Sequence, residues 1–234
     1  MEAPRALPFL QRSTPTLVAL VAQYERTLPA DELGAFVEQL RRLHATFDAA
    51  LSRAPPGPLR AEAAHLLVTG AVAELHGATP TCARGCAACC HYEVEVTRDE
   101  AELLARVVAE GLEIDRARLA RQADRPRGGP AWSELAVEEN RCVFLGRESE
   151  CRVYPHRPAA CRRLLVVSPA VECGRPGGAP RPITIPVAEL VISTALSLPG
   201  SAYTSLPKGV TAELVWVEAE AAERGRARVA PERP

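Results

Sequence analysis

The chain has little that would direct it to a nucleic acid or into a membrane. Its formal net charge is −1 at pH 7, so a general attraction to polyanions or to anionic lipid surfaces is not expected. No apolar run reaches the roughly eighteen residues of a candidate transmembrane helix. Lysine occurs only once, at Lys208, and we attribute this bias toward arginine to genome composition. We therefore expect no nucleic-acid partner and no membrane contact.

Several familiar signals are also missing. The segment from Met1 to Pro8 lacks a basic stretch followed by an apolar one, so we expect no signal peptide. We find no internal repeat, no glycine-rich phosphate-binding loop and no local Ser–His–Asp arrangement. The lack of a signal peptide and of a transmembrane helix favours a cytoplasmic, reducing location, where thiols stay reduced or hold metal.

The chain does contain enough apolar material for a real core. It has 234 residues, of which 47% are hydrophobic. Before residue 80, apolar side chains recur at three- and four-residue intervals, which predicts a layer of three helices. Residues 1–13 look like a frayed arm. The first helix is predicted to start with Thr14 as N-cap and Pro15 as its first residue. Asp31 is the predicted N-cap of the second helix, which the segment 54–58 breaks. The third helix is predicted over 59–75 and ends at Gly77.

Three histidines lie on these helices, at His44, His65 and His76. None belongs to a spaced ligand motif, so we interpret them as surface or rim residues and not as metal ligands.

Cysteine is the residue type that dominates the chemistry. Four of the eight cysteines lie between Cys82 and Cys90, in Cys-Ala-Arg-Gly-Cys-Ala-Ala-Cys-Cys. A lone buried cysteine packs as a small hydrophobe, but this density indicates metal binding, disulfides or redox chemistry. We expect a tight loop that turns sharply at Gly85. In extended backbone Cys89 and Cys90 would point to opposite sides, so one of them could serve a second metal or only the core.

The residues around this loop have mainly structural interpretations. His91 could add a nitrogen ligand, but imidazole ligands normally come in spaced pairs. Residues 92–96 alternate polar and apolar and predict a short strand. Thr97 and Glu100 form a capping box for a helix up to Gly111, so we interpret Asp99 and Glu100 as structural and not as acid–base catalysts. Another helix is predicted over 115–123.

A second block of cysteines follows, and together the two blocks carry a resemblance. The motifs are Cys-x3-Cys-x2-Cys-Cys from Cys82, Cys-x-Phe-Leu from Cys142, Cys-x-Val-Tyr from Cys151, and Arg-Pro-x-x-Cys-Arg from Arg157 to Arg162. In this order they closely resemble the YkgJ-type cysteine-cluster family of zinc- or iron-chelating domains. The resemblance implies seven metal-site cysteines: Cys82, Cys86, Cys89, Cys90, Cys142, Cys151 and Cys161. Cys173 lies beyond the shared pattern, and its role stays open.

The number of thiols exceeds the needs of one centre. A tetrahedral zinc takes four ligands and a [4Fe–4S] cluster takes four thiolates. Two metals, a binuclear site with shared thiolates, or one cluster plus spare redox thiols would all fit. The spacing matches neither a zinc ribbon nor a ferredoxin, which argues against a plain zinc finger but does not select iron. We therefore expect either an iron–sulfur cluster or zinc as the cofactor.

Arginines near the cysteines could offset the negative charge of the thiolates or donate hydrogen bonds to sulfur. The candidates are Arg84, Arg152, Arg157, Arg162 and Arg163. Arg157 and Arg162 belong to the family motif, so we expect these two to contact the cofactor. Pro155 and Pro158 would stiffen the same loop.

The remaining sequence predicts a linker at 174–182, a helix from Pro186 and a last helix over 211–224. The last helix is expected to pack Leu214, Trp216 and Val217 against the body, and we interpret Trp216 as a core anchor.

The overall expectation is a mainly α protein with an irregular, metal-stapled cysteine core and little strand. The expected division is a helical extension (1–79), a cysteine-cluster domain (80–175), C-terminal helices on that core (176–224) and a disordered tail (225–234).

We therefore expect a metal-binding protein that serves redox chemistry, metal handling or a partner protein. A first alternative is an enzyme, because flagellin lysine N-methylases carry a similar cysteine-cluster domain, which would imply S-adenosylmethionine; no methyl-donor motif is visible. A second alternative is a structural zinc domain whose metal supplies only folding energy.

Overall fold

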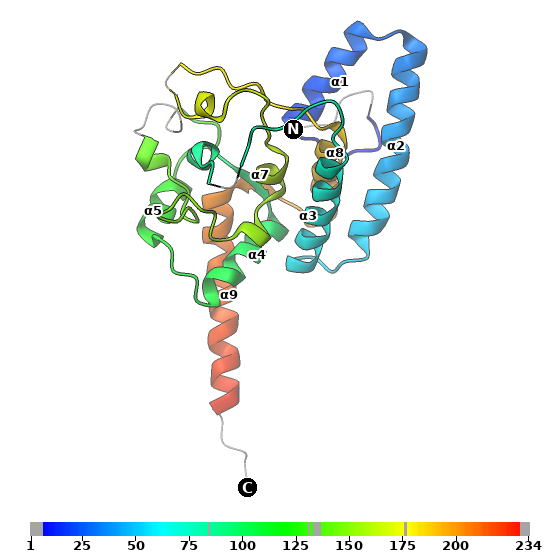
Figure 1. Cartoon of the computed structure of the whole chain (residues 1–234). Coiled ribbons are helices and arrows are strands. Elements are labelled where there is room, and N and C mark those ends of the chain that lie inside the picture. Colours follow the sequence, from blue (N-terminus) through cyan, green and yellow to red (C-terminus); the bar gives the residue numbers. More distant parts are fainter. Residues whose placement is uncertain (1–6, 84, 131, 133–136, 176, 230–234) are drawn as a thin grey trace.

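The computed structural model describes residues 7–83, 85–130, 132, 137–175 and 177–229, the last five for their backbone only. In these residues the protein is mainly α-helical, as predicted (Figure 1). The α-helices are α1 (Pro15–Thr27), α2 (Ala30–Ser52), α3 (Pro58–Ala73), α4 (Arg98–Ala109), α5 (Arg116–Ala123), α7 (Ala159–Arg163), α8 (Pro186–Ser197) and α9 (Leu206–Val229). Short 3-10 turns are η1 (Ala88–His91), η2 (Val137–Asn140), η3 (Tyr154–His156) and η4 (Ala170–Cys173).

A small antiparallel sheet joins the middle of the chain to its C-terminal part. Strand β1 (Glu95–Thr97) pairs with β2 (Tyr203–Ser205), with Val96 opposite Thr204. Each strand leads directly into a helix, β1 into α4 and β2 into α9. The sheet therefore fixes the beginnings of these two helices beside each other.

The helix starts follow capping chemistry in most cases. The Thr14 side chain accepts a hydrogen bond from the Leu17 N–H, and Pro15 is the first residue of α1, as predicted. Thr97 and Glu100 form the predicted capping box of α4. The prediction for Asp31 is wrong, because α2 begins at Ala30 after Pro29, and Asp31 lies in its first turn.

One hydrophobic core joins the N-terminal helices to α8. It contains buried side chains of α1, α2, α3 and α8, including Leu17, Leu51 and Leu190. Leu7 and Leu10 are also buried in it, at 0% and 3% exposure. The prediction of a frayed arm is therefore wrong for residues 7–13, because apolar side chains in that segment pack against the helices; residues 1–6 lie outside the described part.

A second core carries the cysteine region. It is built from α4, α5, α9 and β1, with Phe144 and Val153 inserted from the second cysteine block. Cys142 and Cys151 pack against its edge. The loops that contain these cysteines are thus anchored to the apolar core by their own side chains.

The last helix differs from its prediction in length and in one side chain. It begins at Leu206 and continues through Val229, so the backbone of 225–229 is helical where a disordered tail was expected. Leu214 and Val217 are buried as predicted, but Trp216 is 71% exposed, which corrects its interpretation as a core anchor. Trp216 lies one position away from the buried stripe, and Figure 1 shows the C-terminal half of α9 projecting from the body.

The two C-terminal helices pack on different cores, α8 with α1–α3 and α9 with α4 and α5. The division of the chain into domains stays a prediction.

A buried ion pair links α3 to α4 between the two cores. Arg60 Nε donates to Asp99 Oδ2 at 2.5 Å, and Asp99 Oδ1 also accepts from the Gly57 N–H at 2.7 Å. Arg60 and Asp99 are only 6% and 5% exposed. A buried charge that loses its partner is strongly destabilising.

We expect Asp99→Ala to lower the free energy of unfolding by about 3–5 kcal/mol, because it leaves the Arg60 guanidinium buried and unpaired. Urea-induced unfolding followed by circular dichroism measures the change. Glu38→Ala, which removes a solvated pair with Arg41 on α2, should have little effect. A loss in Asp99→Ala no larger than in this control would contradict the prediction.

Candidate metal centre

The first cysteine segment is an irregular loop, as its crowding predicted. It turns at Gly85, whose φ of +87° lies in the left-handed region that favours glycine, and it ends in the 3-10 turn η1. Cys89 and Cys90 both lie in this turn. A 3-10 turn does not alternate its side chains as a strand does, so the expectation that neighbouring thiols diverge does not apply here.

The two cysteine segments meet through a backbone contact. The Cys142 N–H donates to the Cys90 carbonyl at 2.8 Å. Cys142 and Cys151 lie on the two arms of a tight turn, where Leu145 and Cys151 form an antiparallel bridge and the Gly146 N–H donates to the Glu150 carbonyl at 2.8 Å. Cys161 follows on the short helix α7. The backbone thus brings the second block to the end of the first.

Five thiols form an electrostatically coupled group, which we call the inner group: Cys89, Cys90, Cys142, Cys151 and Cys161. Burial is the main cause that raises the pKa of Cys161 well above its ordinary value, and the neighbouring Cys142, Cys89 and Cys151 raise it further. Burial likewise raises the pKa of Cys142 to about 11. Cys142 and Cys161 therefore resist ionisation unless a cation compensates their charge.

Within this group a side-chain hydrogen bond shifts the pKa values of Cys89 and Cys90 in opposite directions. The hydrogen bond from Cys90 is the main cause that lowers the pKa of Cys89 to about 6, and Arg157 lowers it further. The same hydrogen bond raises the pKa of Cys90. Cys89 is therefore the thiol that ionises first.

The other three cysteines, Cys82, Cys86 and Cys173, form an outer group. Burial raises the pKa of Cys173, and Cys86, Cys82 and, less strongly, Cys89 raise it further, so Cys89 of the inner group also acts on the outer group. The Tyr92 hydroxyl donates to the Cys173 carbonyl and ties η4 to the first cysteine loop. Cys173 thus joins the cysteines that the sequence motif implied, although the motif ended before it. The only sequence signal was the residue type itself.

All eight cysteines are free thiols, and each is half-buried. In the described residues no three of the His, Cys, Asp and Glu side chains are already arranged as a closed set of metal ligands. Binding of a metal would therefore draw the sulfurs closer together, and the assignment of individual ligands stays a prediction.

Two of the candidate arginines lie beside the thiols. Arg157 lowers the pKa of Cys89, Cys151 and Cys161, and its guanidinium stacks 4.9 Å from the Tyr154 ring centroid. Its Nε is buried without a hydrogen-bond partner. A buried donor beside half-buried thiols fits a centre that carries negative charge on sulfur, since thiolates bound to a metal accept such hydrogen bonds.

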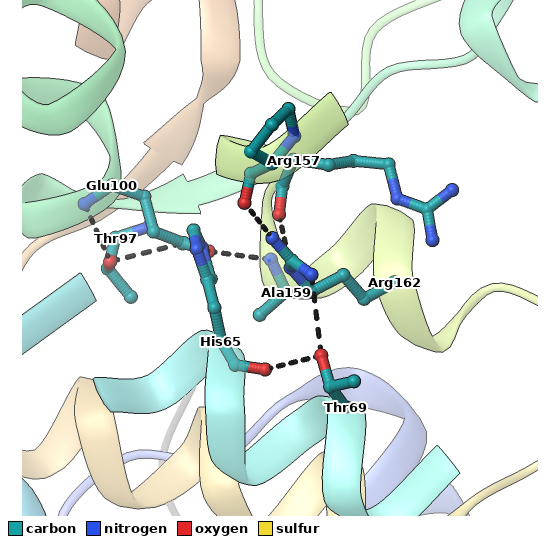
Figure 2. A network of polar contacts seen from close by, with 8 residues as sticks. His65, Thr69, Thr97, Glu100, Arg157, Ala159 and Arg162 are labelled. Carbon is teal, nitrogen blue, oxygen red and sulfur yellow. Dashed lines mark hydrogen bonds and ion pairs between the residues drawn. The ribbon is translucent and has the colours of Figure 1, made fainter. Parts of the chain in front are cut away.

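Arg162 uses its hydrogen bonds on the neighbouring chain, and its expected contact with the cofactor stays a prediction. Its guanidinium donates to the carbonyls of Arg157 and Pro155 and to the Thr69 hydroxyl, so it holds the loop before α7 (Figure 2). Its charge still reaches the inner group, where it lowers the pKa of Cys151.

The other arginines point elsewhere. Arg152 donates to the Glu113 carbonyl, and Arg163 pairs with the buried Glu189 at 2.8 Å. The interpretation of these two as charge compensators is not supported. Arg84 lies outside the described residues.

A buried carboxylate positions the helix that carries Cys161. Glu100 Oε1 accepts from the Ala159 N–H at 2.7 Å, and Glu100 Oε2 accepts from the Thr97 N–H at 2.8 Å (Figure 2). His65 Nε2 lies 3.0 Å from Oε1. Burial raises the pKa of Glu100, but the hydrogen bond and charge of His65 and the two N–H donors outweigh it, so the pKa lies below 4.5.

Three histidines, His44, His65 and His91, have polar contacts within the fold. His65 is 4% exposed, which corrects its interpretation as a surface or rim residue. His44 Nδ1 lies 3.0 Å from the Thr194 hydroxyl, while His76 is exposed. His91 Nδ1 lies 3.3 Å from the Ala87 carbonyl, so this contact uses one of its two possible ligand nitrogens.

Comparison with protein families supports metal binding. Residues 81–173 match the family model described as "Putative zinc- or iron-chelating domain", whose label is CxxCxxCC. The match agrees with the resemblance found in the sequence and extends to Cys173, which the sequence motif did not include. No curated protein and no solved structure shows significant similarity to the chain. None of the described helices has the length and apolar character that crossing a membrane requires.

We expect Glu100→Gln to lower the free energy of unfolding at pH 7 by about 1–3 kcal/mol, because the Ala159 and Thr97 N–H groups lose a charged acceptor. A depressed pKa stabilises the fold above the unfolded value of about 4.5, and this contribution is lost as pH falls through the folded pKa. The stability of the variant should therefore depend less on pH below 4.5. Denaturant titrations at several pH values measure both effects.

Glu102→Gln is the matched control, since Glu102 lies on the same helix and pairs with Arg106 near the surface. An unchanged pH dependence in Glu100→Gln would show that this carboxyl is not depressed.

Proposed function

We propose that the protein binds an iron–sulfur cluster or zinc at its cysteines and acts in redox chemistry or metal handling with a partner protein. The match of residues 81–173 to a family of chelating domains supports this proposal. The observation that carries this proposal is the backbone hydrogen bond that joins Cys142 to Cys90, with Cys151 on the other arm of the same turn and Cys161 close enough to act on the charge of these thiols. Buried thiols that repel one another are unfavourable as anions unless a cation lies between them. A cytoplasmic, reducing location would keep all eight thiols available.

The two groups of thiols suggest two centres with different properties. The inner group has one thiol more than a four-thiolate zinc or [4Fe–4S] centre needs. The outer group of Cys82, Cys86 and Cys173 has one fewer. Three protein ligands leave a fourth position free for water or for a ligand from another molecule. We therefore assign the retained metal to the inner group and an exchangeable metal to the outer group.

Exposed side chains beside the outer group suit a partner protein. Val171 is 67% exposed in η4, and Tyr92, which bonds the Cys173 carbonyl, is 44% exposed. Exposed apolar and aromatic side chains around a half-buried site are typical of protein contact surfaces. A partner that docks here would have access to the outer thiols.

The two alternatives differ from this proposal in what they require. A purely structural zinc domain would keep its metal in closed sites and unfold when chelated. An enzyme using S-adenosylmethionine would need a binding site for that cofactor, and no feature of the described residues identifies one.

We expect the anaerobically purified protein to contain metal in excess of one centre, and elemental and sulfide analysis together with a visible spectrum distinguishes iron–sulfur from zinc. Cys161→Ser should lower the content of tightly held metal, because it leaves the inner group without a spare thiol and requires the adjacent Cys89 and Cys90 both to serve as ligands. Cys173→Ser should remove only the fraction that exchanges with a mild chelator.

Each of these variants is the control for the other, because both exchange one half-buried thiol for a hydroxyl. Equal metal loss in both would contradict the division into two centres. Full retention of metal in both would exclude these residues as ligands.

A further inference from the structure

A groove over strand β2 lies outside the cysteine region and is unused by the proposed function. It consists of two adjoining hollows of about 540 Å³ and 310 Å³ that share Arg127 and Tyr203. The larger hollow is bordered by the end of α5, by β2 and by the beginning of α9, and the smaller by the segment before α1. We call the two together the basic groove.

Cations outnumber carboxylates along the basic groove. The larger hollow is lined by Arg125, Arg127 and Lys208 against one carboxylate, Asp124. The smaller hollow adds Arg12. Glu95 pairs with Arg127 from the neighbouring strand β1. Even with both carboxylates counted, positive charge remains in excess, which favours an anionic ligand.

Arg125 is held in place by neutral partners. Its guanidinium donates to Asn140 Oδ1 at 2.7 Å and to the Glu139 carbonyl at 3.0 Å, and it stacks 4.9 Å from the Trp132 ring centroid. None of these contacts neutralises its charge. The side chain is thus fixed at the groove while its charge stays available, which reduces the entropy lost on binding.

Lys208 occupies an unfavourable position for a structural lysine. It lies in the first turn of α9, whose first turn contains no acidic residue, and it is exposed without an ion-pair partner among the described residues. The amino end of a helix carries partial positive charge, so a cation there is unfavourable. A residue that goes against this charge preference, with no compensating contact, is expected at a functional position.

The smaller hollow contains a buried polar group that lacks a partner. Ser13 lines this hollow and is 4% exposed, and its hydroxyl makes no hydrogen bond in the described structure. Arg12 beside it donates to the Ser201 carbonyl at 2.8 Å but forms no ion pair with a described residue. A buried hydroxyl usually has a partner, and a rotation of this side chain toward the hollow would let it meet a ligand atom.

We infer that the basic groove binds a small phosphate-bearing molecule. Phosphate oxygens suit guanidinium groups, which bind them with paired hydrogen bonds, and an amino group at the positive end of a helix. The phosphates would lie in the larger hollow between Arg125 and Lys208. The remaining polar part of the ligand would pass Arg127 and Tyr203 toward Arg12 and Ser13.

Isothermal titration calorimetry of the full-length, metal-containing protein tests this inference, with pyrophosphate and ATP as separate probes. We expect at least one probe to bind. Lys208→Gln should weaken that binding about tenfold or more, because it removes the cation with no other partner. Lys208 is exposed, so this variant keeps the fold, which circular dichroism checks.

Arg42→Gln is the matched control, since it removes one positive charge from an exposed position on α2. Absence of heat with both probes, or an equal loss of affinity in the two variants, would overturn the inference. Equal binding of citrate would overturn the assignment to phosphate. Neither variant alters a cysteine, so failure here is separable from failure of the metal proposal.

Discussion

The carboxylate of Glu100 connects three parts of the chain that are distant in sequence. It closes the cap of α4, meets His65 on α3 and accepts the Ala159 N–H at the beginning of α7. Because it is almost fully buried, each of these contacts acts in a medium of low dielectric constant, where a misplaced partner is costly. Glu100 therefore positions the Cys161 segment relative to the helical body, together with the contacts of Arg162 and Arg163.

Local signals in the sequence were sufficient for most of the helical framework. Proline and threonine at helix starts identified α1 and α4, because caps are formed by neighbouring residues. Similarly, the dense cysteines and the ordered motifs predicted a metal-binding region, which the family match supports. In both cases the signal lies in neighbouring residues or in short motifs that follow one another in order, so it is visible in the sequence itself.

Long-range packing accounts for what the sequence left out. The burial of Leu7 depends on α8, which lies far along the chain, and no local pattern reports it. Cys173 belongs with Cys82 and Cys86 only through the folded path of 81–173. For Trp216 the error was one of phase, since a helix with buried neighbours at 214 and 217 turns position 216 toward solvent.

The hydrogen bond between the Cys142 N–H and the Cys90 carbonyl affects how a metal would be acquired. Joining two points on a flexible chain costs more entropy as the intervening loop lengthens. Here a peptide hydrogen bond, together with the core packing of Phe144 and Val153, helps to close that loop. The entropy of loop closure is therefore shared between backbone and core contacts and any thiolate ligands, and does not fall on the ligands alone.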